Sequence, residues 1–212
     1  MASQEAISWG QAPAVYDEHT LKILGKEVME DWETGYMHAL ARIATSRGGV
    51  VLELGYGMGI SASAVQAAAI DSHVVVECHP EVIKKCVTDN ADALTSGRMH
   101  IFSGLWQDVT PRLASKSFDG ILFDTYPIKQ DEMIGPHMYF FDEAHRLLKP
   151  GGVLTYYSDE ATGFRPSHME RLVNAGFREE NIDFQVCEVN PPENCEYWQD
   201  PTIIAPIVTK AL

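Results

Sequence analysis

The glycine-rich stretch from Val50 to Ile60, VVLELGYGMGI, is the clearest candidate for a ligand-binding loop in this chain. A β-branched, apolar run leads directly into glycines, and the small-residue segment SASAVQAAA follows, so the order predicts a strand, a tight loop and a helix start. Glycine lets the backbone approach a ligand where a Cβ would block it, and a helix N-terminus offers N–H groups. The stretch therefore predicts a loop that wraps a small molecule.

A second apolar run, HVVVE, ends in Glu77, roughly twenty residues after the glycine loop. A carboxylate at the end of the second strand of such a unit can accept hydrogen bonds from both hydroxyls of a ribose. The first hypothesis is therefore a nucleoside-bearing cofactor.

A further acid, Asp124, stands at the end of the expected strand 118–123, in the sequence FDTYP. The carboxyl ends of strands face the ligand in open α/β sheets, so Asp124 and the following Thr125 and Tyr126 are candidate site residues. The ordinary alternative is a turn aspartate that precedes the proline-containing loop.

Glu33 is a candidate for a different reason. The segment 27–46 has helical periodicity, and Glu33 shares one stripe of that expected helix with Met29 and Met37. A carboxylate on an apolar stripe costs several kcal/mol without a partner. Glu33 either reaches water at the edge of the face or points into a pocket that receives a cation, and the residues alone favour the first reading.

The elements around these residues alternate between strand and helix. Further strands are expected in RMHIFSG, VLTYYS, IDFQVCEV and IIAPIVTKAL, and helices in 80–94, YFFDEAHRLL and PSHMERLVNAGF. This order predicts an α/β fold with a doubly wound, mostly parallel seven-stranded sheet and an antiparallel last strand. Pro206 inside the last run suggests an edge position or a bulge. We expect one domain over 1–212, with 1–26 as an arm or lid, or as a loosely ordered terminus.

The charge balance limits the partners. The formal net charge is −14 and the pI is about 4.9, which argues against nucleic acid and anionic membranes. A small cationic substrate is compatible, although an acidic surface is more often simply a soluble one. The cysteines have no CxxC pair and the histidines no zinc-like spacing, so we expect no metal, reduced thiols and a cytoplasmic protein.

The spacing of the glycines separates two cofactor classes. Dinucleotide oxidoreductases use G-x-G-x-x-G, but this loop reads G-x-G-x-G, preceded by Glu53. The pattern E-x-G-x-G-x-G, together with Glu77 and the KPGG turn, resembles class I (Rossmann-like) methyltransferases that use S-adenosylmethionine. The oxidoreductase alternative predicts nicotinamide binding.

Several blocks resemble the guanidinoacetate N-methyltransferase family over nearly the whole chain. They are SWGQAPAVYD, WETGYMHALA, VLELGYGMGI, GLWQDV, FDGILFDTYP, HRLLKPGGVLTYY, AGFREENI and PIVTK. The blocks GYGMGI and ECHPEV are also similar to the catalytic domain of the fungal arginine δ-N-methyltransferase.

The resemblance implies a role for each matching position. The cofactor would be bound by Trp9, Tyr16, Met37, Gly55, Tyr56, Gly57, Met58, Gly59, Ile60, Glu77, Cys78, His79, Leu105, Trp106 and Asp124. The substrate would be bound by Met29, Glu33, Asp124, Tyr126, Asp159 and Glu160. Glu33 and Asp124 would hold the guanidinium of the substrate, with Asp124 as the base, so the resemblance reverses the first reading of Glu33.

The match breaks after the fifth expected strand. Where the family carries Leu-Thr-Ser, whose hydroxyls bind the substrate carboxylate, this chain has Ser158-Asp159-Glu160-Ala161-Thr162. Acids would repel a carboxylate, so the substrate could be an amine-bearing or a small neutral guanidine. Alternatively, Arg165 receives a carboxylate, or Asp159 and Glu160 simply face solvent.

The predicted activity is therefore N-methylation of the guanidino group of a small molecule, guanidinoacetate or a related guanidine. The alternatives are a methyltransferase of protein or free arginine and a non-catalytic S-adenosylmethionine-binding module. The sequence leaves both a monomer and a homodimer open.

Overall fold

A computed structural model describes residues 4–128 and 135–212 of the chain. The first three residues of the expected arm 1–26 therefore lie outside the described residues. Within the described ranges, no helix combines the length and the apolar character that crossing a membrane requires. The described residues form two sheets, one of seven strands and one of three.

The seven-stranded sheet has the order β6-β5-β4-β7-β8-β10-β9. Its strands are β4 (Val50–Leu54), β5 (Ser72–Glu77), β6 (Met99–Ser103), β7 (Phe118–Phe123), β8 (Leu148–Tyr156), β9 (Ile182–Glu188) and β10 (Thr202–Thr209). Strands β6, β5, β4, β7 and β8 pair in parallel, whereas β10 runs antiparallel to both of its neighbours. This arrangement confirms the predicted mostly parallel sheet with an antiparallel last strand.

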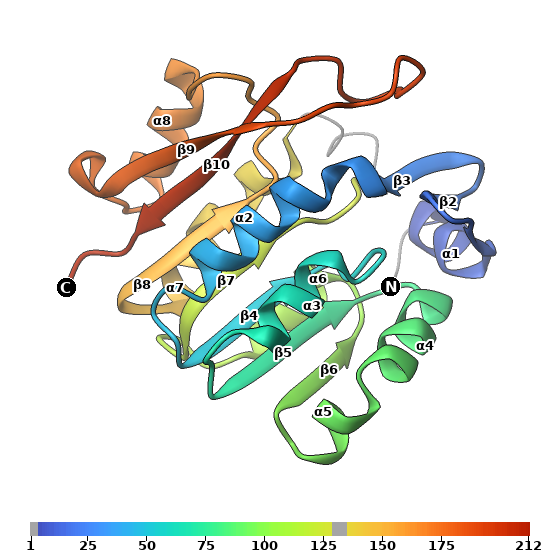
Figure 1. The fold of residues 1–212 in the computed structure, drawn as a ribbon. Helices are drawn as coiled ribbons and strands as arrows, with labels where there is room; N and C mark the ends of the chain where they lie inside the picture. Colours follow the sequence, from blue (N-terminus) through green and yellow to red (C-terminus); the bar gives the residue numbers. More distant parts are fainter. Residues whose placement is uncertain (1–3, 129–134) are drawn as a thin grey trace.

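Helices cover both faces of this sheet (Figure 1). One face carries α2 (Thr34–Ala44), α3 (Ile60–Ala67), α4 (Pro80–Asp89) and α5 (Ala91–Thr95). The other carries α6 (Trp106–Val109), α7 (Phe141–Leu147) and α8 (Pro166–Asn174), and short 3₁₀ turns lie at Thr110–Arg112, Pro136–Tyr139 and Glu179–Asn181. Successive strand residues point to opposite faces, so Val51 joins the first core and Leu52 the second. The expected helix 80–94 is interrupted at Asn90, whose backbone is not helical.

The N-terminal part of the chain is more structured than the composition predicts. It contains α1 (Gln4–Gln11) and a small antiparallel sheet of β1 (Ala14–Tyr16), β2 (Thr20–Ile23) and β3 (Lys26–Glu30), followed by the 3₁₀ turn η1 (Asp31–Glu33). The expected helix 27–46 is therefore wrong over its first turns. Leu24 and Gly25 both have positive φ (54° and 73°), as in the tight turn that joins two hairpin strands, and this turn returns the chain along β2. The helix begins only at Thr34.

The expectation for Pro206 is also wrong in part. Strand β10 lies between β8 and β9 rather than at an edge. Pro206 pairs with Phe184 on the β9 side, whereas the pairs that join β10 to β8 are at Val208 and Thr209. Pro206 has no N–H to donate, and it lies outside the two residues of β10 that pair with β8, so no pair between these strands is lost.

A close backbone contact sets the distance between α2 and the sheet. A Cβ built on Gly120 of β7 would overlap the carbonyl oxygen of Ala44, the last residue of α2. We predict that Gly120→Ala lowers the free energy of unfolding by about 1–3 kcal/mol, because α2 must move away from β7. Gly35→Ala is the matched control, since a Cβ there meets nothing within 4 Å, and its helical position favours alanine. Thermal or urea unfolding measures both, and equal effects of the two variants would contradict the account.

Candidate active site

The site lies where the strand order reverses. Strands β4 and β7 are parallel neighbours, and the chain leaves them at Gly55 and Asp124. A Cβ on Gly55, whose φ is 88°, would overlap the carbonyl oxygen of Asp124. Glycine is therefore required for the two strand ends to come this close, and ligands of open α/β sheets bind at this point.

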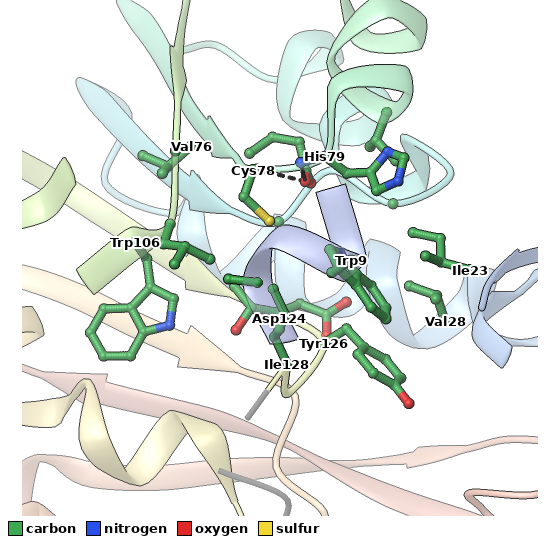
Figure 2. A pocket seen from close by; sticks show the side chains of 18 of the residues that line it. Trp9, Ile23, Val28, Val76, Cys78, His79, Trp106, Asp124, Tyr126 and Ile128 are labelled. Carbon is green, nitrogen blue, oxygen red and sulfur yellow. Dashed lines mark hydrogen bonds between the residues drawn. The ribbon is translucent and has the colours of Figure 1, made fainter. Parts of the chain in front are cut away.

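One cavity at this end, which we call the Glu77 cavity, contains many of the residues predicted to bind the cofactor (Figure 2). Those that line it are Trp9, Gly55, Gly57, Glu77, Cys78, His79, Leu105, Trp106 and Asp124. Residues that the sequence did not indicate also line it, among them Ile23, Val28, Val76, Val82 and Ile128. Figure 2 shows Asp124 between Trp106 on one side and Trp9 with Tyr126 on the other.

The Glu77 carboxylate fastens the glycine loop to the end of β5. One oxygen accepts the N–H of Tyr56 at 2.9 Å, and the other accepts the N–H groups of Cys78 at 2.7 Å and His79 at 2.8 Å. An ionised carboxylate has about four acceptor positions, so these three bonds leave capacity for a ligand hydroxyl. The residue thus meets both requirements of a ribose-binding acid, a fixed orientation and a place on the cavity wall.

The N-terminal segment packs over this cavity. The Trp9 ring is buried and stacks on Tyr126 with 4.7 Å between the ring centroids. Two hydrogen bonds hold the segment to the start of α4, from the N–H of Ala14 to Glu81 at 2.7 Å and between His79 and the carbonyl of Ala12 at 3.0 Å. The predicted arm therefore contributes to the cavity wall through Trp9.

Other predicted cofactor residues lie outside the Glu77 cavity. Tyr56, Met58, Gly59 and Ile60 line a separate, open hollow beside α4. Met37 is buried in the core, and the Tyr16 hydroxyl donates to the carbonyl of Gly57 at 3.1 Å. Met29, which was predicted to bind the substrate, instead lines the Glu77 cavity, where its sulfur accepts the N–H of Met58 at 3.2 Å.

A second cavity, the Glu33 cavity, adjoins the first. Its predicted members are Glu33, Asp124, Tyr126 and Asp159. The residues that line both cavities are Val28, Asp124, Thr125 and Tyr126. Asp124 is therefore on the wall that the two cavities share.

Glu33 is buried, with 3% of its surface exposed. One oxygen, Oε1, accepts the Tyr197 hydroxyl at 2.5 Å and the N–H of Glu30 at 2.9 Å. Burial, followed by the negative charge of Asp124, raises the pKa of Glu33 to about 8. The first reading, a carboxylate that reaches water at the edge of a helix, is wrong, because η1 turns the side chain inward.

Asp124 has a similar environment. Burial, followed by the charges of Glu53 and Asp159, raises its pKa to about 7. Two acids in one cavity thus have pKa values near neutrality, as acids that bind a cation or transfer a proton do. The pair can hold a planar cation with several N–H donors, and either carboxylate can accept a proton from it.

Several polar residues of the Glu33 cavity were not predicted, among them Tyr197, Tyr157 and His137. Tyr197 comes from the loop between β9 and β10, and its ring stacks on Trp32 with 5.9 Å between centroids. The Tyr157 hydroxyl and the Nε2 of His137 are buried and have no hydrogen-bond partner among the residues that the structure describes. In the sequence, the aromatic pair Tyr197-Trp198 within a proline-containing loop is the one feature that could have indicated Tyr197 as a site residue.

The two acids that interrupt the family pattern have different positions. Asp159 has a left-handed backbone, with φ of 56°, and lines the Glu33 cavity. Glu160 is buried outside that cavity, so the prediction that it binds the substrate finds no support. Its carboxylate accepts a hydrogen bond from Arg165 Nε at 2.8 Å and lies 3.1 Å from His168 Nδ1.

The contacts of Glu77 generate a prediction about cofactor affinity. In Glu77→Gln the amide nitrogen would face backbone donors, and charge-assisted bonds would be lost. We expect the affinity for S-adenosylhomocysteine, measured by calorimetry, to fall about 10- to 100-fold. Glu170→Gln, at an exposed position on α8, is the control. An unchanged affinity in Glu77→Gln would contradict this role.

Comparison with known proteins identifies the family of this chain. The model of the family described as guanidinoacetate N-methyltransferase matches residues 2–211. Curated relatives named protein arginine N-methyltransferase 2 are 30% identical over 175 residues in Yarrowia lipolytica (77% of this chain, 36% of the relative) and 33% identical over 177 residues in Aspergillus oryzae (81% and 41%). The chain spans only about a third of the length of most of these relatives.

Solved structures support the fold. Spermidine synthase from Thermotoga maritima superposes with a TM-score of 0.67 at 16% identity, covering 91% of this chain and 65% of that one. TYW2 from M. jannaschii, solved in complex with AdoMet, superposes with a TM-score of 0.60 at 13% identity, covering 95% and 87%. Because the family model spans almost every residue, the chain belongs to the guanidinoacetate N-methyltransferase family and takes S-adenosylmethionine as its cofactor.

Proposed function

We propose that this protein transfers a methyl group from S-adenosylmethionine to the guanidino nitrogen of a small molecule. The Glu77 cavity would hold the cofactor and the Glu33 cavity the guanidine. The observation that carries the proposal is the position of Asp124, which lies on the wall shared by both cavities, one of which a second buried acid, Glu33, also lines.

The residues of the Glu77 cavity fit the cofactor. Glu77 would accept a ribose hydroxyl, and the apolar surface of Leu105 and Trp106 would contact the adenine. Trp9 would cover the bound molecule from the N-terminal segment. The cofactor supplies a methyl group on a positively charged sulfur, and the acids of the neighbouring cavity provide the matching negative potential.

The Glu33 cavity fits a guanidinium. This group is planar, carries several N–H donors and pairs well with carboxylates. Glu33 and Asp124 are buried, which raises the pKa of each, and among the described residues no cationic side chain forms an ion pair with either of them. A bound guanidinium would supply that charge and would hold both acids in the ionised form.

Asp124 is the proposed base. A protonated guanidinium is a poor nucleophile, since its pKa lies above about 12, so a proton must leave as the nitrogen attacks. We infer that an Asp124 oxygen accepts this proton while Glu33 holds the remaining N–H groups. Much of the rate would come from positioning the two reactants and from the charges that the closed site arranges around them.

A substrate on a protein is the second candidate. The curated relatives are named as protein arginine methyltransferases, and an arginine side chain carries the same guanidinium. This alternative predicts turnover on a protein and none on free guanidines. The tail of a small substrate would meet Asp159, Arg165 and Lys26, which also line the Glu33 cavity.

The role of Asp124 is tested by Asp124→Asn. The amide cannot accept the proton, so we expect kcat for the best guanidine to fall about 10²- to 10⁴-fold. The affinity for S-adenosylhomocysteine should change by less than about threefold, because most of the Glu77 cavity is untouched. Persisting turnover would refute the base assignment, and the absence of any methyl transfer by the unmodified protein would point to a binding module.

The pH profile is a separate test. Both acids must be ionised to receive the guanidinium, and their pKa values of about 8 and 7 in the free protein put that ionisation near neutrality. We expect kcat/KM to rise with pH between about 6 and 9 and then to level off, since kcat/KM reports the free enzyme. The substrate stays protonated across this range and adds no inflection. A flat profile from pH 6 to 9 would contradict the pair.

A further inference from the structure

Tyr197 reaches the site from a distant part of the chain and contacts one of its two acids. We propose that Tyr197 is a positioning residue, which occupies Oε1 of Glu33 so that only Oε2 is presented to the substrate guanidinium. This inference rests on the proposed function and adds to it a residue and a restriction on how the substrate is held.

The first observation is the coordination of Glu33. Oε1 accepts two hydrogen bonds, from the Tyr197 hydroxyl at 2.5 Å and from the N–H of Glu30 at 2.9 Å. A carboxylate oxygen has two lone pairs, so Oε1 is saturated. A symmetric, two-oxygen contact between Glu33 and a guanidinium is thereby excluded, and Asp124 must provide the second oxygen that the cation needs.

The second observation is how Tyr197 itself is held. Its ring stacks on Trp32, and the Trp32 indole donates to Glu30 at 2.8 Å, the same residue whose N–H contacts Glu33. The loop between β9 and β10 is thus joined to η1 by the group that orients the acid. The neighbouring N–H of Glu196 adds a contact of 3.5 Å to Glu27 of β3.

The third observation is the electrostatic balance at Glu33. The Tyr197 hydroxyl bond favours the ionised carboxylate and lowers its pKa, against burial and against the charge of Asp124, which raise it. Removing the hydroxyl therefore makes the charged form harder to reach. The predicted consequence is weaker substrate binding, with a smaller effect on the methyl transfer step.

The test compares the full chain with Tyr197→Phe, Glu33→Gln and the double variant, with guanidinoacetate, guanidine and agmatine as probes. For the best of these, we expect Tyr197→Phe to raise KM about 10- to 100-fold and to change kcat by less than about threefold. The midpoint of the kcat/KM profile should move to higher pH. Tyr139→Phe, at an exposed residue that lines neither cavity, should leave KM and the midpoint unchanged.

The double variant separates positioning from a merely structural role. If Tyr197 acts through Glu33, Tyr197→Phe should add less than about threefold to the KM of Glu33→Gln. Independent effects that multiply in the double variant would overturn the inference. Equal affinity for S-adenosylhomocysteine in all variants confirms that the other cavity is intact.

A readout without turnover keeps this inference apart from the proposed function. The ionisation of Glu33 can be followed by NMR of ¹³C-labelled glutamate carboxyls, with Glu33→Gln assigning the signal. We expect Tyr197→Phe to move that titration to higher pH, and this readout does not require methyl transfer. If the protein methylates no guanidine, that absence refutes the proposed function alone. An unmoved titration would refute the positioning role.

Discussion

The buried pair of acids, Glu33 and Asp124, is the constraint on which the rest of the site depends. Burying an ionised carboxylate without a cation is unfavourable, so burial raises the pKa of both acids toward neutrality. The native state therefore binds more protons than the unfolded chain between about pH 4 and 8, and these two groups make the protein less stable as pH rises through that window. A bound guanidinium would stabilise the two ionised carboxylates, so the buried acids that destabilise the free protein would favour the complex.

The fold brings this pair together from separate parts of the chain. Asp124 is fixed by the end of β7, where the glycine loop after β4 is close enough to touch its backbone. Glu33 is fixed by η1, which follows the N-terminal hairpin, and by Tyr197 from the loop before β10. The methyl donor and the acceptor would consequently meet at a wall to which the centre of the sheet, the N-terminal segment and a late loop all contribute.

The parts that the sequence predicts are those set by local patterns. The strand at Val50–Leu54, the glycine loop and Glu77 follow each other within one βαβ unit, so their positions could be derived from periodicity and turn chemistry. The orientation of Glu33 could not, because a two-residue hairpin turn at Leu24 and Gly25 replaces the first turns of the expected helix. Tyr197 contacts Glu33, which is remote in sequence, and Glu160 contacts Arg165 and His168, so neither pairing follows from a local pattern in a single sequence. The resemblance to a family placed Glu33 in the site, which the residues alone did not.

The most direct test of the central claim is the number of protons released when a guanidine binds. Guanidinoacetate or guanidine would be titrated into the S-adenosylhomocysteine complex at pH 7, by calorimetry in buffers of different ionisation enthalpy. If two acids with raised pKa values receive the cation, binding releases about one proton in this pH range, and Glu33→Gln reduces that number. Binding without proton release would show that the acids are already ionised or do not contact the guanidinium, and would contradict the account.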